Sequence, residues 1–128
     1  MAGLGDYPVA GVLRAENLAR AEKFYTEVLG LKKAQTVGGM LEAGDGTMVM
    51  IYERPDLPAP ENTALGFGVS ADRFDELLAD LKVKGVVLED YDIPELGLKT
   101  VDGIADFQGS RAAWFKDSEG NIINVATM

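Results

Sequence analysis

Two different periods of hydrophobic residues run along the chain, and they predict the order of its elements. The short apolar runs at residues 8–15 and 64–70 are typical of buried strands. In the stretch that follows each run, apolar residues recur at every third or fourth position, which indicates an amphipathic helix. The same order, a strand and then a helix, therefore occurs twice.

The two predicted helices have start and stop signals at the same spacing. Asn17 and Asp72 can cap the first turns, because their side-chain oxygens accept hydrogen bonds from free backbone amides. Gly30 and Gly85 can take the left-handed conformation in which many helices end. Both signals are separated by 55 residues, Asn17 to Asp72 and Gly30 to Gly85, which indicates a duplicated unit.

Turn signals predict that more strands follow each helix. Gly38-Gly39 and Asp45-Gly46 separate three short runs after the first helix, which predicts a meander that begins with a strand at residues 34–37. Residues 53–63 contain three prolines and are expected to be a linker. In the second half we expect a strand at residues 86–91. The long loop predicted at 92–109 either lies over a site or is a plain surface excursion.

The last eighteen residues predict a hairpin that closes around Ser118-Glu119-Gly120. Counting outward from this turn, Phe115 faces Ile123 and Trp114 faces Asn124. A side-chain amide inside an apolar strand is costly unless it is hydrogen-bonded. Two explanations stay open for Asn124, a partner elsewhere in the fold and a bound ligand.

The predicted fold class is therefore α+β, with tandem βαβββ modules. We expect one domain over residues 1–128, with a first module at 8–52 and a second at 64–128. Each module alone would expose one face of its sheet to water, so we expect a curved mixed sheet around a concavity, with the helices outside.

Composition excludes several classes of function. Acidic residues outnumber basic ones 21 to 12, for a net charge of −9, so nucleic acid and anionic membranes are not expected partners. The chain has neither cysteine, which excludes disulfides, nor histidine, which removes the commonest general base. Without an apolar leader or a long apolar span, a cytoplasmic location is expected.

Two motifs resemble the vicinal oxygen chelate superfamily, which includes glyoxalase I, extradiol dioxygenases and the fosfomycin and bleomycin resistance proteins. They are the helix ending FYTEVLGL within residues 14–31 and the hairpin AWFKDSEGNIINV at residues 113–125. Ser118 stands where the family usually has proline. The resemblance covers nearly the whole chain and implies the fold, but it says little about function because the fold hosts many chemistries.

The resemblance also implies where metal-dependent members of the family place their ligands. The matching positions in this chain are Ala10, Ala64, Asn124 and, on the fourth strand, Met50. Two methyl groups, a thioether and an amide do not form a donor set for manganese, iron or zinc. We therefore expect no metal and no other cofactor, which removes the metal-assisted reactions of the family.

Strand alternation predicts which residues face the concavity. One wall would carry small residues and the other aromatic and methionine side chains, which suits a planar or apolar ligand. The alternative is that these residues pack together and fill the interior. Arg14 has two interpretations as well, an ion pair at the strand end or a contact to an anionic or carbonyl-bearing ligand. The predicted ligand-binding residues are Ala10, Val12, Arg14, Met48, Met50, Tyr52, Ala64, Gly66, Trp114 and Asn124.

The function expected from the sequence is metal-free binding of a small apolar or aromatic molecule, for sequestration or resistance. No catalytic residue is predicted. The resemblance implies a homodimer, and two alternatives stay open. One is a metal-independent lyase or isomerase of the same superfamily, and the other is a dimerising scaffold with a filled interior and no ligand.

Overall fold

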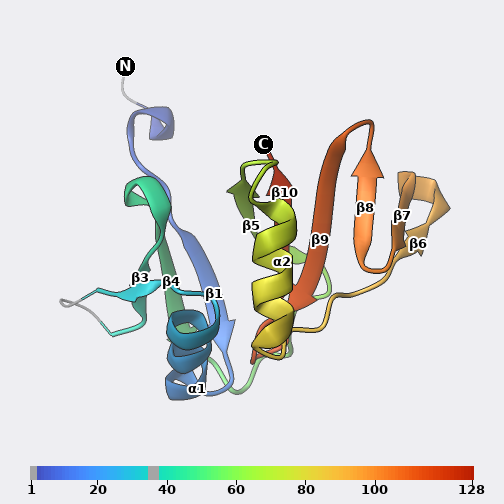
Figure 1. Ribbon diagram of the computed structural model, residues 1–128. Helices are drawn as coiled ribbons and strands as arrows, with labels where there is room; N and C mark the ends of the chain where they lie inside the picture. Colours follow the sequence, from blue (N-terminus) through green and yellow to red (C-terminus); the bar gives the residue numbers. More distant parts are fainter. Residues whose placement is uncertain (1–2, 35–37) are drawn as a thin grey trace. The chain divides into compact units, whose positions relative to one another are not determined.

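The computed structural model describes residues 3–34 and 38–128 (Figure 1). Two compact units make up the chain, Met1–Pro58 and Ala59–Met128. The division between them falls inside the segment 53–63 that the sequence predicts to be a linker. Strand β4 includes Glu53 and strand β5 begins at Thr63, so each strand takes one residue from the predicted linker.

The first unit is a four-stranded sheet with one helix, in the sheet order β1-β4-β3-β2. Strands β1 and β4 run parallel, and the other neighbours are antiparallel. A short 3-10 turn at Leu4–Asp6 precedes the sheet, and another at Gly44–Gly46 joins β3 to β4. The elements are β1 (Gly11–Ala15), α1 (Leu18–Lys23), a π-helical turn (Phe24–Val28), β2 (Lys32–Lys33), β3 (Met40–Glu42) and β4 (Met48–Glu53).

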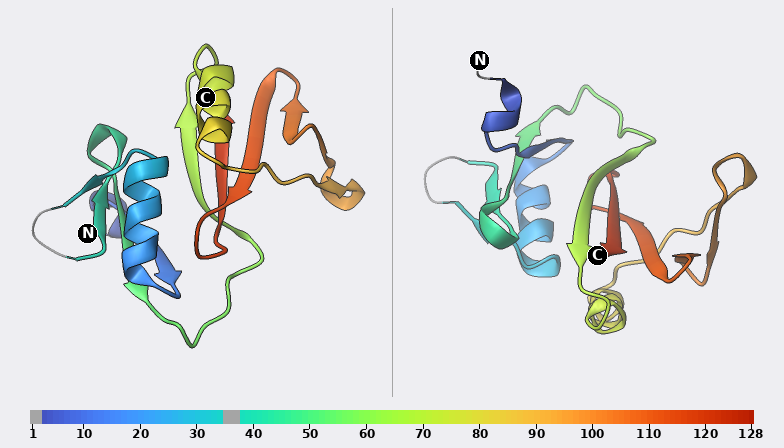
Figure 2. Two further views of the ribbon diagram at one scale, coloured as in Figure 1. Left: turned by 60° about the horizontal axis from the view of Figure 1, so that its bottom comes forward. Right: turned by 90° about the horizontal axis from the view of Figure 1, so that it is seen from above.

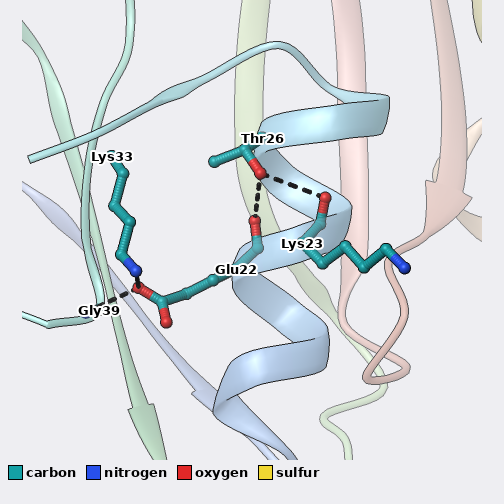
Figure 3. Close-up of polar contacts among 5 residues, drawn as sticks. All are labelled: Glu22, Lys23, Thr26, Lys33 and Gly39. Atoms are coloured by element: carbon teal, nitrogen blue, oxygen red, sulfur yellow. Dashed lines mark hydrogen bonds and ion pairs between the residues drawn. The ribbon is translucent and has the colours of Figure 1, made fainter.

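Helix α1 begins at the predicted cap, where Asn17 Oδ1 accepts a hydrogen bond from Arg20 N at 3.0 Å. The helix widens into its π-helical turn at Phe24, and within that turn the hydroxyl of Thr26 donates to the carbonyl oxygen of Glu22 at 2.8 Å (Figure 3). The carboxylate of Glu22 accepts from Gly39 N at 3.2 Å and lies 3.6 Å from Lys33 Nζ. These contacts fasten the helix to the meander.

Alternation along β1 and β4 separates a buried face from a more open one. Leu13, Val49 and Ile51 are buried together with Ala21 and Tyr25 of the helical segment. The opposite face carries five of the ten residues that the sequence predicts to bind a ligand.

The second unit is a six-stranded sheet with one helix, in the order β5-β10-β9-β8-β7-β6. Strand β5 runs parallel to β10, and the remaining neighbours are antiparallel. Its elements are β5 (Thr63–Val69), α2 (Phe74–Val83), β6 (Asp92–Ile93), a 3-10 turn (Pro94–Leu96), β7 (Leu98–Val101), β8 (Ile104–Phe107), β9 (Ser110–Lys116) and β10 (Ile122–Thr127).

Helix α2 covers one face of the sheet, over β5, β10 and β9, while the β6–β7 end of the sheet extends away from it (Figures 1 and 2). Phe74 is fully buried, and the Arg111 guanidinium lies 4.7 Å from its ring centre. Arg111 also pairs with Asp75 at 2.7 Å. The helix ends as predicted at Gly85, with φ +93°. Because Arg111 is on the same face of β9 as Phe115, this is the face that α2 covers.

The structure confirms the α+β class and the register of the closing hairpin, in which Phe115 pairs with Ile123 and Trp114 with Asn124. The prediction that Asp72 caps the second helix is wrong. The helix begins at Phe74 with Arg73 in the cap position, and no side chain accepts a capping hydrogen bond there.

The predicted strand at 86–91 is also wrong, because only Leu88 forms a strand-like bridge, to Phe115. The predicted loop at 92–109 instead contains the antiparallel pair β7 and β8. Asp102 and Gly103 join these strands with φ of +53° and +82°, a two-residue turn that suits a hairpin. The prediction overlooked this Asp-Gly signal.

Most of the strand predicted at residues 34–37 lies outside the described residues. The pairing with β3 begins earlier than predicted, at Lys32 opposite Glu42. Within the described part of the chain, the helices are too short or too polar to cross a lipid bilayer.

Candidate functional site

The face of β9 and β10 that α2 does not cover carries Trp114. Along these strands Trp114 lies opposite Asn124, and Lys116 lies opposite Ile122, so all four side chains belong to one face. The hairpin therefore places a large aromatic ring, half-exposed, beside a buried isoleucine on the open side of the sheet.

A buried polar turn fixes the register of this hairpin. Asp117 Oδ1 accepts hydrogen bonds from the backbone amides of Glu119 at 2.8 Å and Asn121 at 2.9 Å. Its second oxygen accepts from Asn121 Nδ2 at 2.9 Å. A slip by one residue would break these bonds and turn Trp114 to the other face, so the turn determines where the ring lies.

A hollow of about 340 Å³ opens beside Trp114 within the second unit. Its walls come from the segment before β5, from the hairpin and from the segment that includes β6 and β7. Six of the lining residues, all in these last two regions, are apolar or aromatic, and the other three lie together at the start of β5. The lining residues are Glu61, Asn62, Thr63, Tyr91, Ile93, Leu96, Leu98, Trp114 and Ile122.

Backbone hydrogen bonds hold Tyr91 against Trp114. Glu89 N donates to the carbonyl oxygen of Trp114 at 2.8 Å, which joins the segment to β9. Tyr91 N then donates to Thr100 Oγ1 at 2.8 Å, and Thr100 N donates back to the Tyr91 carbonyl at 2.8 Å. The Tyr91 and Trp114 rings meet edge to face, 5.7 Å apart and at 85°.

Asp90 and Gly103 attach the same segment to the β7–β8 hairpin. Asp90 Oδ1 accepts from Thr100 Oγ1 and from Gly103 N, each at 2.8 Å. Gly103 is buried under Leu88, and a methyl group at that position would come within 2.6 Å of the Leu88 Cβ atom. A glycine is therefore needed where this hairpin crosses beneath the segment.

Burial, and to a smaller extent the negative charge of Glu89, raise the pKa of the Tyr91 phenol above its ordinary value. The phenol is therefore neutral at physiological pH and can donate a hydrogen bond. Glu89 lies 3.8 Å from Lys116 Nζ, so these two charges form a pair on the sheet.

Five of the predicted site residues lie together on the open face of the first unit. Val12 pairs with Met50 and Arg14 with Tyr52, and Met48 lies two residues before Met50 on the same face. Arg14 Nε donates to the carbonyl oxygen of Leu57 at 3.3 Å. Ala10 is exposed and immediately precedes β1.

In the second unit Asn124 lies beside Gly66 of the neighbouring strand. Its amide nitrogen donates to the Ala113 carbonyl at 3.2 Å, so the amide has a partner within the fold. Ala64 falls where the register of β5 against β10 shifts, between the pairs Ile122 with Thr63 and Ile123 with Leu65, so simple alternation does not assign its face.

Of the ten predicted site residues, Trp114 alone lines the 340 Å³ hollow. Sequence reasoning missed Tyr91, Ile93, Leu96 and Leu98, because they lie in segments read as a strand and a loop. The Asp102-Gly103 turn signal identifies the hairpin that includes Leu98. The residues at the start of β5 were assigned to the linker, and no sequence signal marks them as part of a site.

The side chains at the metal-ligand positions of the resembled family do not fit a metal. Ala10 and Ala64 offer only methyl groups, Met50 a half-buried thioether, and the amide of Asn124 is directed to Ala113 and Gly66. Across residues 3–34 and 38–128, no three histidine, cysteine or acidic side chains come together as a metal-binding group.

Comparison with known families identifies the fold. The family model described as the Glyoxalase/Bleomycin resistance protein/Dioxygenase superfamily matches residues 8–125. The chain belongs to this superfamily. This confirms the resemblance seen in the helix ending and the closing hairpin. Among curated proteins, none matches the chain significantly.

Solved structures of low sequence identity share this superfamily fold. A glyoxalase/dioxygenase from Nostoc punctiforme is 15% identical with a TM-score of 0.70, over 99% of this chain and 95% of that one. The fosfomycin resistance protein FosX from Listeria monocytogenes is 15% identical with a TM-score of 0.69, over 100% and 94%. The oxidase ChaP-H2 is 20% identical with a TM-score of 0.68, over 95% and 93%. At these identities the likeness shows the fold alone.

Proposed function

We propose that this superfamily member binds a small apolar or aromatic molecule, without a metal, in the hollow beside Trp114. The observation that carries the proposal is the lining: two aromatic rings held edge to face, with Ile93, Leu98 and Ile122 around them. A volume of about 340 Å³ lies at the lower end of the range for small-molecule sites, and such sites are mostly apolar with a few polar groups.

Exposure of the lining adds a driving force for binding. Leu96 is 72% exposed in the free protein, and Trp114 and Tyr91 are partly exposed. A ligand that covers these side chains removes apolar surface from water, which contributes roughly 25 cal/mol for each Å². The neutral phenol of Tyr91, together with Asn62 and Thr63, supplies polar groups that can orient the ligand. A binder of this kind sequesters its ligand.

Trp114 is the single tryptophan of the chain, so its fluorescence reports on the hollow directly. We expect planar aromatic compounds to perturb this emission with saturable affinity, and we expect the affinity to be the same with and without a chelator. A panel of compounds that never perturbs Trp114 would contradict the proposal and favour a scaffold without a ligand. Binding that requires a stoichiometric metal would also contradict it.

A pair of exposed positions provides matched variants. Leu96→Asp places a charge in the lining of the hollow, where a neutral aromatic compound would bury it, and should weaken the binding of that compound by about tenfold or more. Val101→Asp introduces the same charge at a similarly exposed position, 67% against 72%, outside the lining, and should leave affinity unchanged. Equal affinities for the two variants would place the ligand elsewhere.

We also propose that the chain forms a homodimer, as its resemblance to the superfamily implies. Sedimentation equilibrium should then give twice the chain mass of 13.7 kDa. A single species at the chain mass would contradict the proposed homodimer.

A further inference from the structure

The charge of the lining narrows the chemical class of the ligand. Of the nine residues around the hollow, the only charged one is Glu61, an exposed acid, and none is basic. Lys116 is a basic group on the same face of the sheet, but it lies outside the lining and is paired with Glu89 at 3.8 Å. No basic group in the lining therefore attracts an anionic ligand, and one acid opposes it.

The two rings supply a second, independent attraction for positive charge. The face of an aromatic ring carries negative partial charge, and a cation within about 6 Å of the ring centre is attracted to it, most strongly over tryptophan. Trp114 and Tyr91 stand nearly perpendicular at 85°, so the angle between them is bounded by a face of each ring. Of the two rings, tryptophan provides the stronger cation site.

From the lining we infer that the ligand is an organic cation, a quaternary ammonium joined to a flat apolar group, with its charge near Glu61 and the aromatic pair. This inference rests on the proposed function and specifies the ligand class. A quaternary ammonium is weakly hydrated and needs no hydrogen-bond acceptor, so it loses less on entering an apolar hollow than a primary ammonium does. The flat group lies against Ile93, Leu98 and Ile122.

Three probes of matched shape test the charge. They are (meta-hydroxyphenyl)trimethylammonium, its neutral carbon isostere meta-tert-butylphenol, and the anionic meta-hydroxybenzenesulfonate. Binding is measured by isothermal titration calorimetry and by Trp114 emission. We expect the cation to bind about three- to thirty-fold more tightly than the isostere, the range that a partly exposed cation–π contact gives, and the anion to bind most weakly.

Two variants locate the source of the preference. Glu61→Gln should reduce the preference for the cation over the isostere about two- to fivefold and leave affinity for the isostere unchanged. Asp80→Asn, on the exposed side of α2, removes the same net charge away from the hollow and should leave the preference as in the parent. An equal effect of the two variants would show that net charge, and not Glu61, sets any preference.

The outcomes separate this inference from the proposed function. If the neutral isostere binds as tightly as the cation or more tightly, the inference about charge is wrong and the apolar site stands. If none of the three probes binds or perturbs Trp114, both fail for this hollow. A preference for the anion would overturn the inference outright.

Discussion

Gly103 is the position where one added methyl group should disturb both stability and the site. It is buried in the turn between β7 and β8 with φ +82°, a conformation that costs an alanine about 1 kcal/mol. The new Cβ atom would also lie 2.6 Å from Leu88 Cβ and 2.9 Å from its Cδ1. Because the Leu88 Cβ position is fixed by the backbone, the clash cannot be relieved by a side-chain rotation alone. Overpacking of this kind costs about 1–3 kcal/mol, so Gly103→Ala should destabilise the fold by about 2–4 kcal/mol.

Gly109 provides the matched control for this change. It has a left-handed φ of +98° in the turn between β8 and β9, but a methyl group there would meet nothing within 4 Å. Gly109→Ala should therefore cost only the backbone term, about 1 kcal/mol. The difference between the two variants isolates the contact with Leu88.

Urea denaturation followed by Trp114 emission and by circular dichroism measures both variants. If they lose equal stability, Leu88 does not press on Gly103 and the described packing of the hairpin is wrong. Binding provides a second measurement, because displacement of Leu88 moves the segment that carries Tyr91. At protein concentrations and temperatures where Gly103→Ala is folded, its affinity for the aromatic probe should be lower than that of Gly109→Ala.

Two other predictions concern the site and its turn. Since the pKa of the Tyr91 phenol is raised in the folded protein, the difference in tyrosinate absorbance between the parent and Tyr91→Phe should titrate above the ordinary tyrosine range. The stability linked to this neutral phenol should be fully present below a pH of about 10 and should be lost as the pH rises through the pKa of the folded state. If the absorbance difference instead titrates in the ordinary tyrosine range, the Tyr91 ring is solvated. Asp117→Asn replaces the buried acceptor of three hydrogen bonds and should cost about 3 kcal/mol in urea denaturation. Asp106→Asn changes an exposed turn with one such bond, to Gly109 N at 3.0 Å, and should cost less than about 1 kcal/mol, so equal costs would show that the Asp117 turn is not a special constraint.

Local sequence signals were sufficient to predict those parts of the fold in which the interacting residues lie within one short stretch of the chain. The closing hairpin is an example, because its turn and the alternation on both sides specify the pairing of Trp114 with Asn124. The cap at Asn17 and the end of α2 at Gly85 are others, since each needs only the next helical turn.

Residues 86–91 show why the rest was not predicted. The run is apolar and reads as a strand, yet only Leu88 bridges to β9. The hydrogen bonds of the segment go to residues outside it, to Leu81, Thr100, Gly103 and Trp114. The hydrophobic pattern of these six residues does not reveal such partners, because tertiary contacts decide the conformation of the segment.

The residues predicted to bind a ligand came from equivalent positions of the two modules. The hollow, in contrast, is lined in part by an additional segment of the second module. Between Gly30 and Glu53 the described part of the first unit forms β2, β3 and β4, but between Gly85 and Thr127 the second forms five strands, β6 to β10. The additional segment carries Ile93, Leu96 and Leu98, which line the hollow, and Tyr91 directly precedes it.

A duplicated fold that lacks metal-ligand side chains at the expected positions can therefore still offer a hollow for a ligand. The side chains of a longer connection between two strands can line it. In this chain the closing hairpin contributes the tryptophan, and the hydrogen bonds of Thr100 bring the tyrosine to it. Under the proposed function, ligand binding depends on the length and sequence of one connection more than on the shared fold. Shortening that connection between Asp92 and Gly97 should remove binding, while α2, which packs on the opposite face of the closing hairpin, keeps the second unit folded.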